Sequence, residues 1–326
     1  MSEYAKKFGI TIVEEPVLYD SMLYLRLKKA TNKRRLYTVL EGFFAFCTVA
    51  LGLLIYVFPP KDLPEEVFAT VFIIVIFVFG TATALFEHDK KTENWKIKRL
   101  LHDNIVRGAL KETFETMQFS PGWHLQPTEI ASSGLAPYRG MPAGSDYVKG
   151  SYKGVPFVFS NLHFTTTNND GETKSMGIFK GQWLILEVDR VFKERLILRE
   201  KSEGALGEIG LKSVVETENI AFNRKFQIST DDPLNVFLIL TPNLMEEIIA
   251  IDRRANARTC MSFVTSGDKN YIHITFHNNM EIFNIPANHK FTYGCIPAIR
   301  GRMKSEIQYM TGMIDALLKN DYLFKK

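Results

Sequence analysis

Two apolar stretches decide the architecture, LYTVLEGFFAFCTVALGLLIYVF at residues 36–58 and VFATVFIIVIFVFGTATALF at residues 67–86. Each is long enough for a helix to cross a hydrocarbon core of ~30 Å, which takes about 20 residues. The linker between them, PPKDLPEE at residues 59–66, is so short that the two helices must run antiparallel. We therefore predict a two-helix transmembrane hairpin, with the rest of the chain on one side of the bilayer.

Basic residues are distributed unevenly around this hairpin. Six precede the first run within residues 26–35, and five follow the second within residues 90–99, whereas the linker has a single lysine against three acidic residues. Basic residues beside short spans stay on the cytoplasmic face. We expect both termini in the cytoplasm and the linker outside. The alternative, a buried helical hairpin of a soluble protein, does not account for this asymmetry.

Composition limits the classes of function. The chain has 326 residues, 46% of them hydrophobic, and a formal net charge of +4. The basic excess lies mostly beside the apolar runs, where anionic lipid accounts for it, and no basic stripe with interleaved aromatic residues indicates a nucleic-acid partner. The three cysteines, Cys47, Cys260 and Cys295, are far apart without a CxxC pair. This suits a reducing cytosol and predicts no disulfide and no metal site.

The chain divides into four segments. Residues 1–35 are predicted to form an N-terminal cytoplasmic tail and a juxtamembrane helix, and residues 36–86 the transmembrane hairpin. Residues 92–119 repeat apolar side chains at helical spacing, which predicts an amphipathic connector helix. Residues 120–326 contain alternating strand patterns, turn signals and helices with N-terminal cap residues. They predict a cytosolic α+β domain with a mostly antiparallel sheet.

Within this domain, the patterns place each element. We predict strands at 145–152, 155–166, 177–188, 194–199, 214–215, 222–228, 260–264, 271–277 and 280–285, and helices at 233–240, 242–256 and 297–318. Two of the helices have clear start signals, because Asp232 and Thr241 each precede a proline.

Glu41 is an acidic residue inside the first apolar run, one to two turns from its cytoplasmic end. Carboxylates at membrane depth are costly and often functional, although a shallow one can extend to the interface instead. Antiparallel pairing predicts that Glu41 lies opposite residues 81–84, where a threonine can form a hydrogen bond with it. We expect the seam between the helices to follow the small residues, namely Gly42, Ala45 and Gly52 on the first and Ala69, Gly80 and Thr83 on the second.

An aromatic-Lys-Gly pattern occurs twice, with Lys153 and Lys180 as its lysines. A glycine in this position is typical of a turn that needs a positive φ, which is the favoured interpretation. The alternative is an anion site in which both lysines converge on a phosphate or a lipid headgroup. Glu41, Lys153 and Lys180 are therefore the interaction candidates that the sequence offers.

Motifs for catalysis, cofactors and metals do not emerge. His273 and His277 share a strand face but are ~13 Å apart along it, too far for one metal ion even with His163 nearby. Nucleophile elbows, Walker loops and dinucleotide fingerprints are missing from the sequence. We therefore name no catalytic, cofactor-binding or metal-binding residue, and the balance is against an enzyme.

Three stretches carry a resemblance to a known family, namely residues 151–164, 178–198 and 226–249. Tyr152–Phe157, Phe179–Gly181 and Leu240–Met245 resemble motifs of a family of uncharacterised bacterial membrane proteins with a domain of unknown function. The resemblance covers most of the chain after residue 95. It implies two spans ahead of the domain and a bacterial setting, but no activity. The family's Ala-Arg-Tyr before Leu-Thr-Pro is replaced here by Val236–Leu238.

These observations predict an integral protein of the bacterial inner membrane. Its cytosolic domain is expected to act as a scaffold or regulator by binding a protein or lipid partner at the membrane, or another copy of the chain. A membrane-proximal enzyme is the alternative. An oligomeric transporter component is a weaker one, because a single hairpin cannot line a pore.

Overall fold

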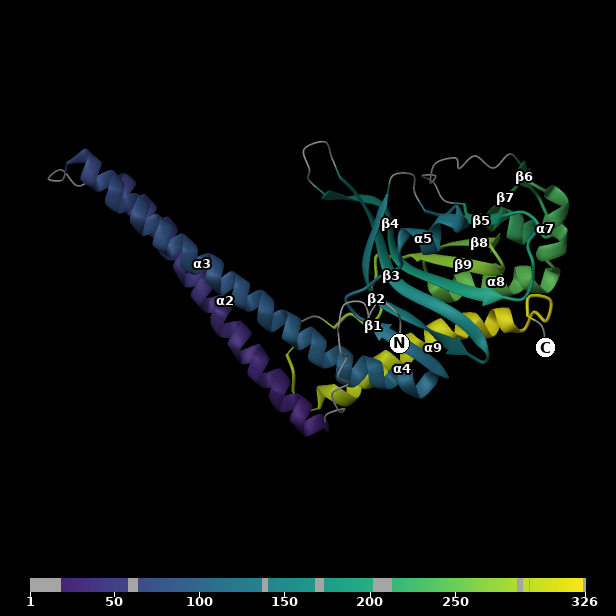
Figure 1. The fold of residues 1–326 in the computed structure, drawn as a ribbon, viewed down its shortest axis with the longest axis horizontal. Coiled ribbons are helices and arrows are strands. Elements are labelled where there is room, and N and C mark those ends of the chain that lie inside the picture. The colour runs from purple at the N-terminus through teal and green to yellow at the C-terminus, as the bar shows by residue number, and fades with distance from the viewer. Residues whose placement is uncertain are drawn as a thin grey trace. The chain divides into compact units, whose positions relative to one another are not determined.

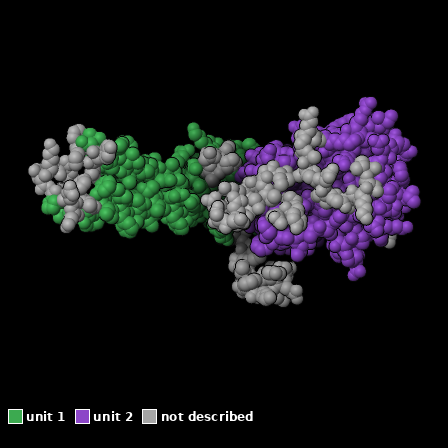
Figure 2. Space-filling view, turned by 90° about the horizontal axis from the view of Figure 1, so that it is seen from above, with its two compact units in different colours: residues 1–108, 285–301 green, residues 109–284, 302–326 purple. Residues whose placement is uncertain are grey.

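The computed structural model describes residues 19–57, 64–136, 140–167, 173–201, 213–285, 290–292 and 294–324. The predicted tail before residue 16 and most of the linker between the apolar runs lie outside these residues. The chain divides into two compact units, coloured separately in Figure 2. Unit 1 contains residues 1–108 and 285–301, and unit 2 contains residues 109–284 and 302–326.

Unit 1 contains the apolar hairpin. Its helices are α2 (Asp20–Val57) and α3 (Glu65–Leu101), which lie side by side in Figure 1. Both are long and apolar enough to cross a membrane, so the predicted two-helix apolar hairpin is confirmed. At 1.5 Å per residue each helix is ~55 Å long, which exceeds a hydrocarbon core of ~30 Å. The pair therefore continues as helices well beyond the apolar runs.

Aromatic side chains fill the seam of the hairpin. The ring of Phe44 on α2 lies 5.7 Å from that of Phe79 and 5.4 Å from that of Phe86, both on α3. The predicted seam is wrong at its glycines, because a Cβ added at Gly42, Gly52 or Gly80 would meet no atom within 4 Å. These glycines lie away from the partner helix, and the rings set the separation of the two helices instead.

The seam residues of α2 recur at alternating spacings of four and three, the heptad pattern of a coiled coil. They are Leu23, Leu27, Ala30, Arg34, Tyr37, Glu41 and Phe44. Leu23 and Leu27 are fully buried, as is Ile97 on α3. At residues 23–30, beyond the apolar run, the seam is therefore aliphatic, and the two helices stay packed there.

The helix after the second apolar run differs from the predicted connector. α3 continues without a break through a π-helix, His102–Val106, into α4 (Arg107–Thr113). The predicted end at residue 119 is wrong, because residues 116–120 pair with a strand as β1. Tertiary pairing with that strand overrides the helical spacing of the last residues.

Unit 2 contains a nine-stranded antiparallel sheet with the order β1-β2-β3-β4-β9-β8-β5-β7-β6 (Figure 1). The strands are β1 (Thr116–Ser120), β2 (Met141–Tyr152), β3 (Val155–Thr167), β4 (Thr173–Val188), β5 (Leu196–Glu200), β6 (Ser213–Val215), β7 (Phe226–Thr230), β8 (Arg258–Ser266) and β9 (Lys269–His277). The helices are α5 (Pro127–Ile130), a 3-10 turn (Ala131–Ser133), α6 (Ile220–Lys225), α7 (Pro233–Ile239), α8 (Pro242–Ala255) and the part of α9 (Cys295–Leu318) from residue 302 onward. The α+β domain with its antiparallel sheet is confirmed.

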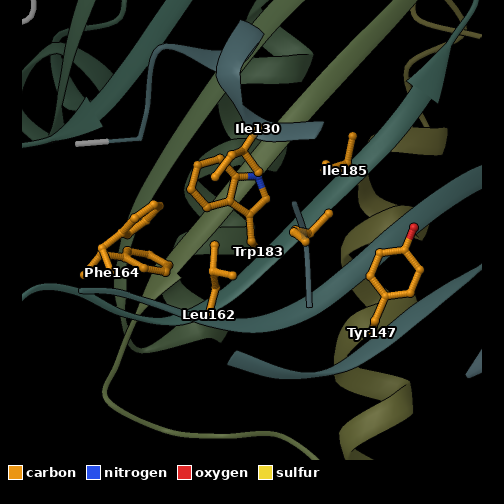
Figure 3. Close-up of a cluster of buried hydrophobic side chains, with 8 residues drawn as sticks. Ile130, Tyr147, Leu162, Phe164, Trp183 and Ile185 are labelled. Carbon is orange, nitrogen blue, oxygen red and sulfur yellow. The ribbon is translucent and has the colours of Figure 1, made fainter. Parts of the chain in front are cut away.

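Both faces of the sheet's centre are buried, each against different segments. On one face Phe157 packs against Phe114, with ring centroids 4.7 Å apart, and Phe276 against Tyr309 of α9, 6.1 Å apart. On the other face Trp183 lies within an apolar cluster under α5 (Figure 3). The cluster contains Leu125, Ile130, Tyr147, Leu162, Phe164, Phe179, Trp183 and Ile185.

Two predicted strands are not formed as expected. The predicted strand at 222–228 begins only at Phe226, because Asn219 caps α6 by accepting a hydrogen bond from the Phe222 amide. The segment at 280–285 is a loop. Its backbone is bound by side chains, since Asn161 accepts from the Ile282 amide and donates to the Ile282 carbonyl, at 3.0 and 2.7 Å. These side-chain bonds replace the ladder that a strand would need.

Glycines 154 and 181 serve different purposes, although both follow an aromatic-Lys pair. Gly154 has a φ of 78° in the turn between β2 and β3, as the turn interpretation predicts. Gly181 is different, because it lies within β4 opposite His277 of β9. A Cβ at Gly181 would clash with the carbonyl oxygen of Phe276. Close approach of two strands, and not a turn, therefore requires this glycine.

We predict that Gly181→Ala lowers the free energy of unfolding by about 3 kcal/mol, since a backbone carbonyl cannot move aside cheaply. Gly154→Ala should cost only about 1 kcal/mol, because its Cβ meets open space and only the left-handed conformation is penalised. Urea unfolding of the purified full chain, followed by tryptophan fluorescence, measures both. Equal losses in the two variants would contradict the close-approach explanation.

Candidate functional site: a pocket between α5 and the sheet

The structure gives Glu41 a partner that the sequence did not indicate. Its carboxylate forms an ion pair with Lys90 of α3. The predicted bond to a threonine is wrong, because Thr81 and Thr83 donate to carbonyls of their own helix. The ion pair lies in the seam, where each charge satisfies the other. Any interaction of Glu41 beyond this hairpin stays a prediction.

Lys153 and Lys180 lie too far apart to share an anion. Lys153 precedes the first residue of β3, whereas Lys180 is opposite His163 near the other end of that strand. From 155 to 163 is eight strand positions, or about 26 Å at ~3.3 Å each. Each lysine also pairs with a carboxylate, Lys153 with Asp315 at 2.6 Å and Lys180 with Glu281 at 3.7 Å. Separate roles for the two lysines remain predictions.

His273 is locked in one neutral form. Burial lowers its pKa to about 3, and the indole Nε1 of Trp183 donates to its Nδ1 at 3.3 Å. The ring proton must then be on Nε2. Ser262, directly opposite on β8, therefore faces an imidazole that cannot accept its proton. The pair lacks the arrangement of a serine nucleophile with its base.

Groups of three or more metal-ligating side chains are not found among the described residues. The three histidines that were considered as ligands of one metal ion also lie opposite different residues. His163 is opposite Lys180, His273 is opposite Ile185, and His277 is opposite Gly181.

A pocket of about 320 Å³ opens between α5 and the sheet. Its lining residues are Thr128, Glu129, Ser132, Lys149, Gly150, Pro156, Phe157, Val158, Ile185, Glu187, Ser266, Lys269 and Tyr271. They come from α5, the 3-10 turn, β2, β3, β4 and the β8–β9 hairpin. This volume is at the lower end of the range for sites that bind small molecules.

Strand register places the floor of the pocket. Lys149 is opposite Val158, Val158 is opposite Ile185, and Ile185 is opposite His273. Directly opposed residues of antiparallel strands point to the same side of the sheet. These four side chains therefore form one row across four strands, with the lysine at one end and the buried histidine at the other.

The carboxylates of the pocket are already engaged. Glu187 forms an ion pair with Lys269 at 2.7 Å. Glu129 accepts hydrogen bonds from the Gln126 amide at 2.7 Å and from the Tyr147 hydroxyl at 2.9 Å. Burial and the Glu129 carboxylate raise the pKa of Tyr147, so this hydroxyl keeps its proton. Glu129 both caps α5 and anchors it to β2.

Sequence reasoning missed this pocket. Lys149 is one of several lysines in strand-like sequence. The residues around it give no signal that distinguishes it from Lys153. Only the register of β2, β3, β4 and β9 brings it to an apolar floor contributed by residues far along the chain. The strand alternation at 155–158 was a usable signal for a buried face, but not for a cavity.

A second feature of unit 2 is an apolar surface on α7, formed by Leu234, Phe237 and Leu238. Their side chains are 76%, 52% and 48% exposed. The spacing of three and four residues puts them on one side of the helix, while Val236 and Ile239 are buried on the other. α7 and α8 together are also apolar enough for a broken span, with a bend of 80° between them.

Neighbouring segments hold α7 in place. The Asn235 amide donates to the carbonyl of Glu194, in the segment before β5, at 3.1 Å. At the other end, Thr241 between α7 and α8 receives a hydrogen bond from Asn320 at 3.4 Å. These hydrogen bonds hold α7 against its neighbours with Val236 and Ile239 buried. Its exposed apolar residues therefore face outward on a docked helix.

Residues 177–319 match a protein family described as "Protein of unknown function (DUF3137)". This range runs from β4 into the end of α9, so it includes Phe179–Gly181 and Leu240–Met245 but not Tyr152–Phe157. The expected domain of unknown function is confirmed over this part of the chain, which is shorter than the resemblance implied. No curated protein and no solved structure matches the chain.

We predict that acid destabilises the domain through His273. Its pKa is about 3 when folded and 6.5 when unfolded. Between these values the unfolded state binds more protons, so the free energy of unfolding falls as pH falls, by up to ~1.4 kcal/mol per pH unit. His273→Gln should flatten this slope between pH 6 and pH 4, whereas the control His163→Gln should not. Urea titrations of the full chain at several pH values measure it, and parallel wild-type and His273→Gln profiles would contradict it.

Proposed function

We propose that this chain is a membrane-anchored binding protein of the bacterial inner membrane, whose cytosolic domain recruits a protein partner. The hairpin is the anchor, and the α+β domain presents the binding surface. The exposed apolar surface of α7 is the observation that carries the proposal.

The distribution of basic residues supports the topology. Residues 26–35 and 90–99 are at the same end of the hairpin, beyond the apolar runs, and they contain eleven lysines and arginines between them. Because basic flanks stay on the cytoplasmic side, both termini and the whole of unit 2 belong in the cytoplasm.

Three strongly shifted titratable groups of unit 2 are removed from proton transfer. Burial lowers the pKa of His273 and raises those of Tyr147 and Tyr309, so all three are neutral over the physiological range. A general acid or base works best with a pKa near the operating pH. In these three residues burial acts in the opposite direction, and it removes them from proton transfer.

The α7 surface favours a protein over a lipid as the occupant. Large apolar side chains grouped on a soluble domain commonly mark an interaction site. Two acidic residues, Asp231 and Asp232, immediately precede α7. An anionic bilayer would be repelled by this pair, whereas a protein partner can supply the opposite charge.

The topology predicts a clear protection pattern. Protease added outside intact cells should leave residues 87–326 uncut, while the same protease should digest them in inverted membrane vesicles. Antibodies to an epitope tag at the C-terminus report both results. Loss of the tag in intact cells would place unit 2 outside and contradict the proposal.

The α7 surface predicts a site-specific partner. A photo-crosslinking residue at Phe237 should yield one discrete protein adduct in native membranes, whereas the same probe at exposed Met141 of β2 should not. Leu234→Ser combined with the Phe237 probe should reduce the adduct about thirtyfold, because burial of a leucine contributes ~2 kcal/mol and each 1.4 kcal/mol is about a factor of ten. Equal adducts at both positions, or adducts with lipid only, would contradict a protein-binding role for α7.

A further inference from the structure

We propose that the pocket between α5 and the sheet binds a small organic anion, a carboxylate on a short apolar body, with Lys149 as its charge partner. This site is distinct from the α7 surface, and the proposal does not depend on the function proposed above.

The sign of the ligand follows from the charges in the pocket. Its lining includes two lysines and two glutamates. Glu187 is paired with Lys269, and Glu129 holds the Gln126 amide and the Tyr147 hydroxyl. Lys149 forms no ion pair with any residue in the described part of the chain. The four formal charges of the lining cancel, but Glu187 is matched by Lys269 and both oxygens of Glu129 accept hydrogen bonds within the pocket wall. Among the described lining residues, the Lys149 ammonium is therefore the charged group with its donors left for a ligand, and it selects an anion.

The apolar body follows from the floor. Ile185 belongs to the apolar cluster under α5, Val158 and Tyr271 pack against that cluster, and Pro156 also lines the pocket. A bare inorganic anion would leave this floor uncovered, whereas a short hydrocarbon would remove it from water. Lys149 is in the same cross-strand row as Val158 and Ile185, so its ammonium is available at the rim while the body covers the floor.

The volume limits the size of the ligand. About 320 Å³ corresponds to roughly ten water molecules at ~30 Å³ each. A carboxylate with four to six carbons, linear or ring-shaped, fits this space. Hexanoate is therefore a suitable probe, with hexylammonium as its match in length and its opposite in charge.

The test measures binding to the full chain in nanodiscs by saturation-transfer difference NMR. Hexanoate and hexylammonium are titrated separately against wild type and against Lys149→Gln, Lys149→Arg and Lys153→Gln. Inorganic phosphate, which has no carbon-bound protons to observe, is titrated as a competitor of the hexanoate signal. Lys153 is a matched control, because it is also on the β2–β3 hairpin but pairs with Asp315 outside the pocket. Nanodiscs without the protein report partitioning of the probe into the bilayer. Unfolding curves confirm that each variant is folded.

We expect saturable hexanoate binding to wild type and to Lys153→Gln, a loss of about tenfold or more in Lys149→Gln, and near-complete retention in Lys149→Arg. Hexylammonium and phosphate should bind at least tenfold more weakly than hexanoate. Equal hexanoate binding by Lys149→Gln, or no saturable binding to wild type, would overturn the site. If phosphate binds as tightly as hexanoate, the claim that the ligand has an apolar body is wrong. If hexylammonium binds as tightly as hexanoate, the claim that the ligand is an anion is wrong.

Discussion

Directly opposed residues of antiparallel strands point to the same side of a sheet, so the register of β2, β3, β4 and β9 decides which side chains meet. This register sends Phe157 and Leu186 to one face and Val158 and Ile185 to the other. A slip of one residue would exchange the two faces and expose the core. Gly181 allows β9 to approach β4 at one point of this pairing. The apolar cluster, the pocket and the buried histidine all follow from the same alignment.

Buried polar groups give this sheet its specificity. Asn161 and Gln182, opposed on β3 and β4, bind the backbone of the segment at 280–282 and hold it without a strand ladder. Trp183 fixes the tautomer of His273. A buried amide or imidazole without such partners would destabilise the fold. These polar residues of the sheet's centre therefore hold the architecture together through their hydrogen bonds.

The hairpin has its own internal order. Aromatic rings fill the seam within the apolar runs, the pair of Glu41 and Lys90 marks their end, and Leu23 and Leu27 continue the seam beyond it. An ion pair at this depth is compatible with the membrane because each charge compensates the other. The same carboxylate that looked anomalous in the sequence thus has a structural role in aligning two helices.

The sequence by itself determined what depends on local pattern. The apolar runs specified the hairpin, and cap residues before Pro233 and Pro242 specified α7 and α8. Tertiary structure alone decided what depends on partners far along the chain. Residues 116–119 have helical spacing but pair with β2 as a strand. The segment expected to be a strand at 280–285 is a loop bound by Asn161. Lys149 lines a pocket together with residues from three other strands. Periodicity in the sequence shows which side of a helix or strand is buried. It does not show which other helix or strand covers that side.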